Sequence, residues 1–353
     1  NTLRGGVVVS KYASEKALGG LSLYIAGHPV PNEKSQLAGE AILSLLAQCG
    51  KYDLVIFLIS GGGSALVTSP VAGVSLTDLQ QLTSLLLGSG ARIDEINTLR
   101  RALDGIKGGG LARAACPAKQ ISLILSDVVD SPLEAIASGP TVPNPTRNSD
   151  AFMVLEKYDL LHKISPAIIS ALKRNDVETA TLSGKAFVIG SNQISAKAAK
   201  QKAVQEGYEA HILTTSLQGE ASEKGAELAM YLRNLGAGSQ CIIVGGETTV
   251  TLGKSHGFGG RNQEVALASV EILSGSRDKM LVTLATDGDD GPTDAAGAVV
   301  TGNTFMKAKA LGFETITYLR EHNAHPYFKA LGDLLEIGPT GTNVNDLIFL
   351  FVF

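Results

Sequence analysis

Glycine-rich and acidic segments follow the short apolar runs of this chain, and they carry the residues that could do chemistry. The first such segment, Ser60-Gly61-Gly62-Gly63-Ser64, comes directly after the apolar run 54–59. Three consecutive glycines ahead of a helical stretch expose backbone N–H groups, which can bind an anion with help from the helix N-terminus. The alternative is a simple tight turn, and we favour the anion site.

Cationic side chains gather in a second segment. Asn97, Arg100 and Arg101 precede the run Lys107-Gly108-Gly109-Gly110. Arg suits a carboxylate or phosphate because it can donate two parallel hydrogen bonds, and Lys contributes a point charge. Each cation alone is more typical of a solvated helix surface. Together with the glycines, Asn97, Arg100, Lys107 and Gly108 predict a site for an anionic ligand.

Two further polar residues follow apolar runs. Asp127 comes after the run 121–125, where a carboxylate can serve as a metal ligand or as a base toward a hydroxyl. Asn192 comes after the run 186–189 and precedes a helical stretch. It can bind substrate or nucleotide, and the alternative is a helix N-cap at Ser191 or Asn192.

Glu247 and Arg261 belong to two neighbouring glycine-rich segments. Glu247 lies in Gly245-Gly246-Glu247-Thr248-Thr249, and Arg261 follows Gly257-Phe258-Gly259-Gly260. Arg261 stands at a predicted helix start behind glycines, which suits an arginine that neutralises phosphate charge.

Four carboxylates fall within the eight residues from Asp287 to Asp294. Carboxylates this close repel one another unless a cation joins them. We therefore predict Mg²⁺ bound by Asp287, Asp290 and Asp294, partly through water. The EF-hand spacing, which ends in Glu, does not match. Near the C-terminus, we interpret Asn345 and Asp346 mainly as turn formers and leave a function open.

These residues need a sheet that brings the ends of its strands together, because ligands of open α/β sheets bind at the carboxyl ends of the strands. Short β-branched runs alternate with helical stretches, which predicts an α/β fold. We predict two domains, residues 1–180 and 181–353, each a mainly parallel sheet flanked by helices; one large domain with a long excursion is the alternative. The strand candidates are 6–10, 21–25, 54–59, 121–125, 186–189, 210–213, 241–244, 248–252, 280–285 and 347–353, and the helix candidates are 32–48, 77–88, 195–206, 222–235 and 263–273.

Composition excludes several classes of protein. The 353 residues carry a net charge of −4, no Trp and 5% aromatic residues, so neither a basic stripe for nucleic acid nor stacking platforms are expected. The three cysteines show no metal-binding or disulfide spacing, which indicates a reducing compartment. The apolar runs are of strand length, so we expect no membrane span and no membrane partner.

Several segments together resemble the glycerate 2-kinase family. The resemblance rests on the residues 26–31, 60–66, 106–109, 137–141, 259–264, 286–297 and 338–347, which follow the family's order and span essentially the whole chain. It implies a cytoplasmic enzyme that uses ATP and Mg²⁺ to phosphorylate D-glycerate to 2-phosphoglycerate between two α/β domains. The N-terminal domain would be Rossmann-like, and the C-terminal domain, with a mixed sheet, would resemble the family's MOFRL domain.

The chain departs from the family pattern in two places. The family has an N-terminal helical segment and a strand followed by Gly-Lys ahead of the point where this chain begins, so we expect that the natural N-terminal segment is missing. The family pattern Ser-Asp-Val-Val-Gly-Asp is replaced by Ser126-Asp127-Val128-Val129-Asp130-Ser131. Only Asp127 is therefore carried over.

Phosphoryl transfer depends on alignment and charge neutralisation more than on covalent chemistry. We expect Arg261 and Lys107 to act on anionic oxygens and Asp127 to orient or deprotonate the 2-hydroxyl, which makes these three the predicted catalytic residues. The predicted nucleotide- and substrate-binding residues are Ser60, Gly61, Gly62, Gly63, Ser64, Asn97, Arg100, Gly108, Asn192 and Glu247.

Two rival functions remain open. Some family members are labelled hydroxypyruvate reductases, but an NAD(P)H-dependent reductase needs a dinucleotide-binding loop, and the third glycine of that fingerprint is absent after Gly257 and Gly259. A non-catalytic sugar-phosphate-binding module would bind without turnover. The expected partners are small molecules, D-glycerate and ATP, and a homo-oligomer is left open.

Overall fold

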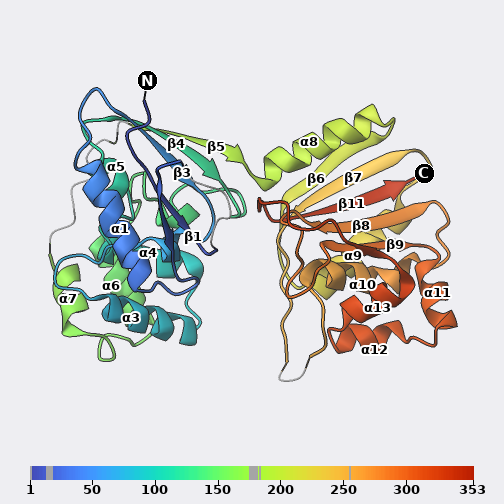
Figure 1. The fold of residues 1–353 in the computed structure, drawn as a ribbon. Coiled ribbons are helices and arrows are strands. Elements are labelled where there is room, and N and C mark those ends of the chain that lie inside the picture. Colours follow the sequence, from blue (N-terminus) through green and yellow to red (C-terminus); the bar gives the residue numbers. More distant parts are fainter. Residues whose placement is uncertain (1, 13–18, 175–181, 183, 254–255) are drawn as a thin grey trace. The chain divides into compact units, whose positions relative to one another are not determined.

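The computed structural model describes residues 2–12, 19–174, 182, 184–253 and 256–353 (Figure 1). The chain divides into two compact units. Unit 1 comprises Asn1–Leu125 and Ser131–Ile189, and unit 2 comprises Ser126–Asp130 and Gly190–Phe353. Among the described residues, no helix has both the length and the apolar character that crossing a bilayer requires.

Unit 1 is built on a three-stranded sheet of order β3-β4-β5, formed by β3 (Leu54–Ile59), β4 (Lys119–Leu125) and β5 (Lys185–Gly190). Strands β3 and β4 are parallel. A separate parallel pair is formed by β1 (Val7–Ser10) and β2 (Ser22–Ile25). The helical segments are α1 (Glu33–Leu46), α2 (Gly63–Leu66), α3 (Leu76–Gly88), α4 (Ile93–Leu103), α5 (Gly110–Ala114), the 3₁₀ helix η1 (Ile136–Ser138), α6 (Asn148–Lys157) and α7 (Pro166–Leu172).

A helical layer in unit 1 holds α4 in place. Helix α3 begins at Ser75, which exchanges capping hydrogen bonds with Asp78 and so satisfies N–H groups at the helix start. Apolar residues three and four positions apart line one face of α3 and pack against α4, α6 and α7. Burial of each large apolar side chain contributes about 1.5–3 kcal/mol, so the last turn of α4, which carries Arg100, has a stable position. The core residues include Leu82, Leu86, Leu99, Leu103, Leu155 and Ile168.

Unit 2 contains a six-stranded sheet of order β10-β9-β8-β11-β7-β6. Its strands are β6 (Glu209–Leu217), β7 (Gln240–Gly246), β8 (Lys279–Ala285), β9 (Gly297–Thr301), β10 (Leu334–Leu335) and β11 (Asp346–Val352). Its helices are α8 (Asn192–Gln205), α9 (Ala221–Asn234), α10 (Arg261–Leu273), α11 (Thr304–Ala310), α12 (Thr315–Arg320) and α13 (Ala324–Leu331). Helix α8 packs on one face of the sheet, and α9 and α10 pack on the other (Figure 1).

The last strand of the chain lies in the middle of the unit 2 sheet. Strand β11 is antiparallel to both of its neighbours, so its first residue, Asp346, lies opposite Gly246 at the end of β7 and Ala285 at the end of β8. The first residue of β11 therefore joins the sheet edge at which β7 and β8 end. This arrangement brings together segments that are about a hundred residues apart in the sequence.

The α/β class and the mixed sheet of the C-terminal part are confirmed. Parallel pairing in that sheet is limited to β6 with β7, because β9, β10 and β11 all pair antiparallel. The predicted strand 248–252 is wrong, since only Thr249 forms an isolated bridge, to Glu220. The units also differ from the predicted domain boundary at 180/181: β5 pairs in the sheet of unit 1, and 126–130 group with unit 2.

Candidate active site

Arg261 is the centre of an ionic cluster in unit 2. Its Nε donates to Oδ2 of Asp346 at 2.6 Å, and its Nη2 donates to Oδ1 of the same carboxylate at 3.2 Å. Its Nη1 donates to Oε1 of Glu247 at 2.6 Å, and Asn345 Nδ2 donates to the other oxygen of Glu247 at 2.8 Å. We call these four residues, Arg261, Asp346, Glu247 and Asn345, the Arg261 cluster.

The topology of unit 2 explains why these four residues meet. Glu247 directly follows β7, Asp346 begins β11 beside the end of β7, and Arg261 is the first residue of α10. Residue type and spacing predict Glu247 and Arg261 for the site. The interpretation of Asp346 as mainly a turn former is wrong, because Asp346 opens a central strand and binds Arg261 with both carboxylate oxygens.

Burial and charge act against each other in this cluster. Burial raises the pKa of Asp346 and of Glu247, and the guanidinium of Arg261 opposes that shift in both. Burial by itself lowers the pKa of Arg261, but the hydrogen bonds and charges of Asp346 and Glu247 outweigh it, so the pKa is raised. Arg261 is therefore a fixed cation whose direction is set by two carboxylates.

Asp127 and Asn192 lie near the same cluster but differ in what they do. The charge of Asp127 raises the pKa of Glu247, so the two carboxylates are within electrostatic range. Asn192 donates to the backbone oxygens of Val344 and Asp346 at 3.0 and 2.8 Å, which holds the start of β11. The N-cap of α8 is Ser191, as the alternative interpretation had it.

Asp290 and Asp294, two of the three predicted magnesium ligands, bind different groups of the protein. Asp290 is buried and accepts the N–H groups of Asn262 and Gln263 at 3.0 and 2.8 Å, so it caps the start of α10. Asp294 is exposed and accepts from His325 at 3.0 Å. Within the residues that the structure describes, no three His, Cys, Asp or Glu side chains form a metal site. The residues present therefore do not fit a three-carboxylate Mg²⁺ site.

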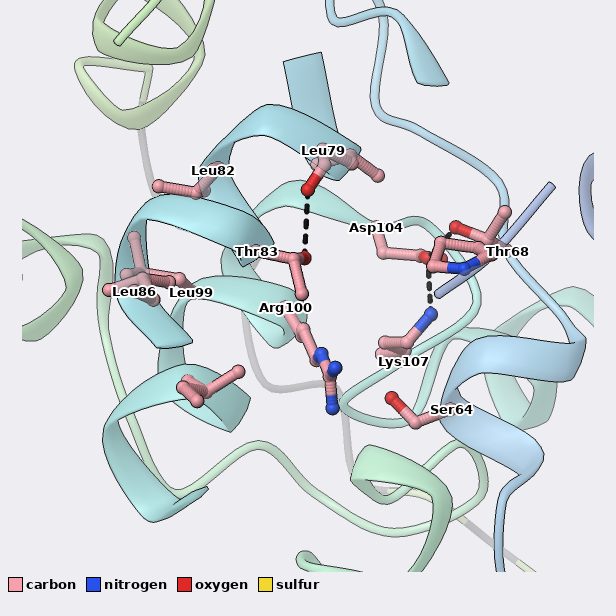
Figure 2. A pocket seen from close by; sticks show the side chains of 12 residues that line it. Ser64, Thr68, Leu79, Leu82, Thr83, Leu86, Leu99, Arg100, Asp104 and Lys107 are labelled. Atoms are coloured by element: carbon pink, nitrogen blue, oxygen red, sulfur yellow. Dashed lines mark hydrogen bonds and ion pairs between the residues drawn. The ribbon is translucent and has the colours of Figure 1, made fainter. Parts of the chain in front are cut away.

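A second group of predicted residues meets in unit 1. Ser64 Oγ and Ser138 Oγ are 2.8 Å apart, Ser138 donates to Asn97 Oδ1 at 2.9 Å, and Arg100 Nη1 donates to the same oxygen at 3.5 Å. We call Ser64, Asn97, Arg100 and Ser138 the serine–arginine cluster. Arg100 and Ser64 line a cavity of about 30 Å³, and their polar ends face the same space (Figure 2).

Lys107 also lines this cavity, but its ammonium group turns toward Asp104 (Figure 2). The two side chains form a buried ion pair, and Lys107 Nζ donates to the Val67 carbonyl at 3.2 Å. Burial lowers the pKa of Lys107, and the carboxylate of Asp104 opposes that shift. Asp104 also accepts from Thr68 Oγ1 at 2.6 Å. In this position Lys107 stabilises the turn that it begins, and a catalytic role for it stays a prediction.

The glycine loops of unit 1 have distinct roles. Gly62 has a φ of +76°, and the N–H groups of 61–64 donate to no acceptor in the described parts of the chain. This geometry is typical of an anion-binding loop. Gly108, with a φ of +53°, donates to the Ser138 carbonyl at 3.0 Å. It thus supports the turn that presents Ser138.

Ser138 is a residue of the serine–arginine cluster that the site prediction missed. It is fully buried, and both Ala137 and Ser138 have left-handed backbone conformations, with φ of +50° and +60°. Such conformations cost energy in residues other than glycine, and they cluster at functional sites. The sequence contains no pattern that predicts positive φ at these two residues.

Comparisons with known proteins agree for the two parts of the chain. Residues 1–173 match the family described as "Domain of unknown function (DUF4147)", and residues 240–346 match the MOFRL family. The chain is 42% identical to glycerate 2-kinase of Pyrococcus horikoshii, over 98% of this chain and 81% of the relative. It is 39% identical to a putative hydroxypyruvate reductase of Agrobacterium vitis, over 97% of this chain and 80% of the relative.

A solved structure is similar along nearly the whole chain. The crystal structure of glycerate kinase from Thermotoga maritima shares 42% sequence identity and superimposes with a TM-score of 0.95, over 99% of this chain and 86% of that chain.

Proposed function

Because the chain belongs to the glycerate 2-kinase family and is a kinase, we propose that it transfers the γ-phosphoryl group of ATP to the 2-hydroxyl of D-glycerate. Its C-terminal part is a MOFRL domain. In this proposal residues of both units take part, and the product is 2-phosphoglycerate. The observation that carries the proposal is the Arg261 cluster, a guanidinium held by two carboxylates at the start of a helix.

Arg261 is suited to stabilise a transferred phosphoryl group. A guanidinium has five N–H groups, and three of those of Arg261 bind Asp346 and Glu247. The other two have no partner among the described residues, so they can bind a ligand. Since Asp346 fixes the plane of the guanidinium, those two point in a set direction. A preorganised cation of this kind stabilises developing charge without rearranging during the reaction.

The other predicted residues complete the proposal. Asp127, in electrostatic range of Glu247, orients or deprotonates the acceptor hydroxyl. The loop 60–64, in which the N–H groups of 61–64 have no acceptor among the described residues, binds anionic oxygens. Mg²⁺, when bound, would neutralise charge on the phosphates of ATP, and the proposal assigns no ligands to it.

The test is conversion of D-glycerate by the full chain with ATP and Mg²⁺, followed by phosphorus NMR of the product. Arg261→Ala should lower kcat by about 10²–10³, the loss typical of one transition-state contact. Arg233→Ala is the matched control, because Arg233 is exposed and its guanidinium only donates to the Ile272 carbonyl at 3.2 Å among the described residues. A kcat of Arg261→Ala close to that of the control would remove the role proposed for Arg261.

A reductase is the second candidate, because one relative carries the name of a putative hydroxypyruvate reductase. Incubation of the chain with hydroxypyruvate and NADH, or NADPH, should leave the absorbance of the reduced nicotinamide unchanged. Consumption of the nicotinamide at a rate that depends on hydroxypyruvate would favour the reductase instead.

A further inference from the structure

Arg100 is a largely buried cation that lacks a full set of partners. It lies in the last turn of α4, and burial lowers the pKa of its guanidinium, while the charge of Asp104 opposes that shift. Within the described parts of the chain its one hydrogen bond is the long contact of 3.5 Å to Asn97. Four N–H groups are left over, and a partly desolvated guanidinium in this state favours an anionic ligand.

The hydrogen bonds of the serine–arginine cluster can run in one direction only. Arg100 can only donate, so Asn97 must present its oxygen to it. Ser138 must then donate its one hydrogen to that same oxygen, at 2.9 Å. Ser64 is left to donate to Ser138, at 2.8 Å. As a result, Ser64 Oγ offers lone pairs and no hydrogen to the cavity, and it can accept a hydrogen bond from a hydroxyl group.

The remaining polar side chains around the cavity are already engaged. Thr68 and Lys107 both bind Asp104, and Thr83 donates to a carbonyl of its own helix at 2.8 Å. Since the ammonium group of Lys107 is paired with Asp104, the cavity offers Arg100 as its cation without a carboxylate partner and Ser64 as an acceptor of a hydroxyl hydrogen. That pair suits a hydroxy acid. A phosphate is disfavoured, because its charged oxygens would face the lone pairs of Ser64.

The size of the cavity limits the ligand further. Its volume is about 30 Å³, and one water-sized group takes about 10–15 Å³ on this measure. There is room for two or three such groups, so the cavity can take a small polar ligand or the end of one. A nucleotide does not fit.

From these observations we propose that the serine–arginine cluster binds D-glycerate by its two ends, with the C1 carboxylate on Arg100 and the C3 hydroxyl donating to Ser64 Oγ. The inference rests on the proposed function and deepens it. With both ends held, the C2 hydroxyl is the one left outside the cavity. Ser64 is thus a specificity-determining residue that selects the position of phosphorylation.

The first test compares two acids on two serine variants of the full chain. D-Lactate has the carboxylate and the C2 hydroxyl of D-glycerate but lacks the C3 hydroxyl. Its KM in the unaltered protein should be about 3- to 10-fold higher, the effect of one neutral hydrogen bond. Ser64→Ala should raise the KM for D-glycerate to that level, while the KM values for D-lactate and ATP stay the same.

Ser84→Ala is the matched control. Ser84 is exposed on α3, and its hydroxyl donates to the carbonyl of Gln80 in the same helix at 3.0 Å. This variant should keep the full preference for D-glycerate. Arg100→Lys should raise the KM for both acids together, because both carry the carboxylate.

The second readout is the product. With Ser64→Ala, phosphorus NMR should detect 3-phosphoglycerate beside 2-phosphoglycerate, because the C3 hydroxyl is no longer held. A loss of folding or packing would slow both acids equally and would not change the product. Equal effects of Ser64→Ala on the two acids, with the product unchanged, would overturn the inference.

Failure of this inference can be told apart from failure of the proposed function. If the unaltered protein phosphorylates D-glycerate but Ser64→Ala keeps the preference over D-lactate, the cluster is not the acid site and the kinase proposal stands. If no phosphorylation occurs, the kinase proposal fails, and calorimetric titration of both acids tests the cluster directly. A preference for D-glycerate that Ser64→Ala abolishes would support the site, and no heat from either acid would refute it.

Discussion

The substitution Asp346→Asn tests whether Arg261 acts in a direction set by its carboxylate partner. The carboxylate of Asp346 accepts from both Nε and Nη2 of Arg261, at 2.6 and 3.2 Å. Asparagine has almost the same shape but replaces one accepting oxygen with an NH₂ group. That group would face an N–H of the guanidinium, so one hydrogen bond is lost and two donors are opposed.

The size of the effect follows from this geometry. A hydrogen bond to a charged group contributes about 1.5–3 kcal/mol, and Asp346→Asn removes one of the two that orient Arg261. If about 2 kcal/mol of transition-state stabilisation is lost, kcat falls about 30-fold. Glu247 still binds Nη1, so the loss should remain smaller than that of Arg261→Ala.

The assay is steady-state kinetics with D-glycerate and ATP on the unaltered chain, Asp346→Asn, Arg261→Ala and the double variant. If Asp346 acts through Arg261, its substitution should lower kcat in the unaltered chain and have almost no further effect once Arg261 is alanine. Asp278→Asn is the control, because its carboxylate is half exposed and lies 3.6 Å from Lys279. A kcat for Asp346→Asn within about threefold of the control, or equal effects in both backgrounds, would show that Asp346 does not act through Arg261.

Two stability predictions follow from the buried charges. Burial raises the pKa of Asp290 to about 6. Asp290 therefore holds a proton more tightly in the folded state than in the unfolded state. The free energy of unfolding should decrease by at most about 3 kcal/mol as pH rises from about 4 to about 6. Asp290→Asn should remove that slope in urea unfolding of the full chain, and an unchanged slope would assign it to other groups. Asp104→Ala leaves the charge of Lys107 buried without its carboxylate and should destabilise unit 1 by about 3–5 kcal/mol. Lys107→Met should lower the melting temperature less, because Asp104 keeps its hydrogen bond from Thr68; the reverse order would contradict this account.

Local sequence patterns were enough for much of the framework. The apolar runs 54–59 and 280–285 are strands at or within one residue of their predicted ends, and Ser75 caps α3 as its residue type favours. These features depend on interactions between residues that are close in sequence, such as a side chain that satisfies an N–H three positions on. The short strands β9 and β10 were missed; β10 has only two residues, Leu334–Leu335, which is too short for a recognisable sequence pattern.

For the site, residue type and spacing pointed to Arg261, Glu247, Ser64 and Arg100 as candidates, because glycine runs and cations stand out in any sequence. Residue type and spacing did not predict the partners of these residues. Asp346 reaches Arg261 only because β11 enters the middle of a sheet antiparallel to both neighbours. Ser138 contacts Ser64 only because it lies in a strained turn, which no residue pattern predicts.

The acidic segment 287–294 shows that residues close in sequence can also fail to meet in the folded chain. Four carboxylates close in sequence predicted one metal site, but two of the predicted ligands turn to different partners. Asp290 turns inward to cap α10, and Asp294 turns outward to His325. Local residue patterns were sufficient for the class of fold and for the types of side chain near the strand ends. They could not show which side chains meet, because these contacts join strands, turns and helix ends that are far apart in the sequence.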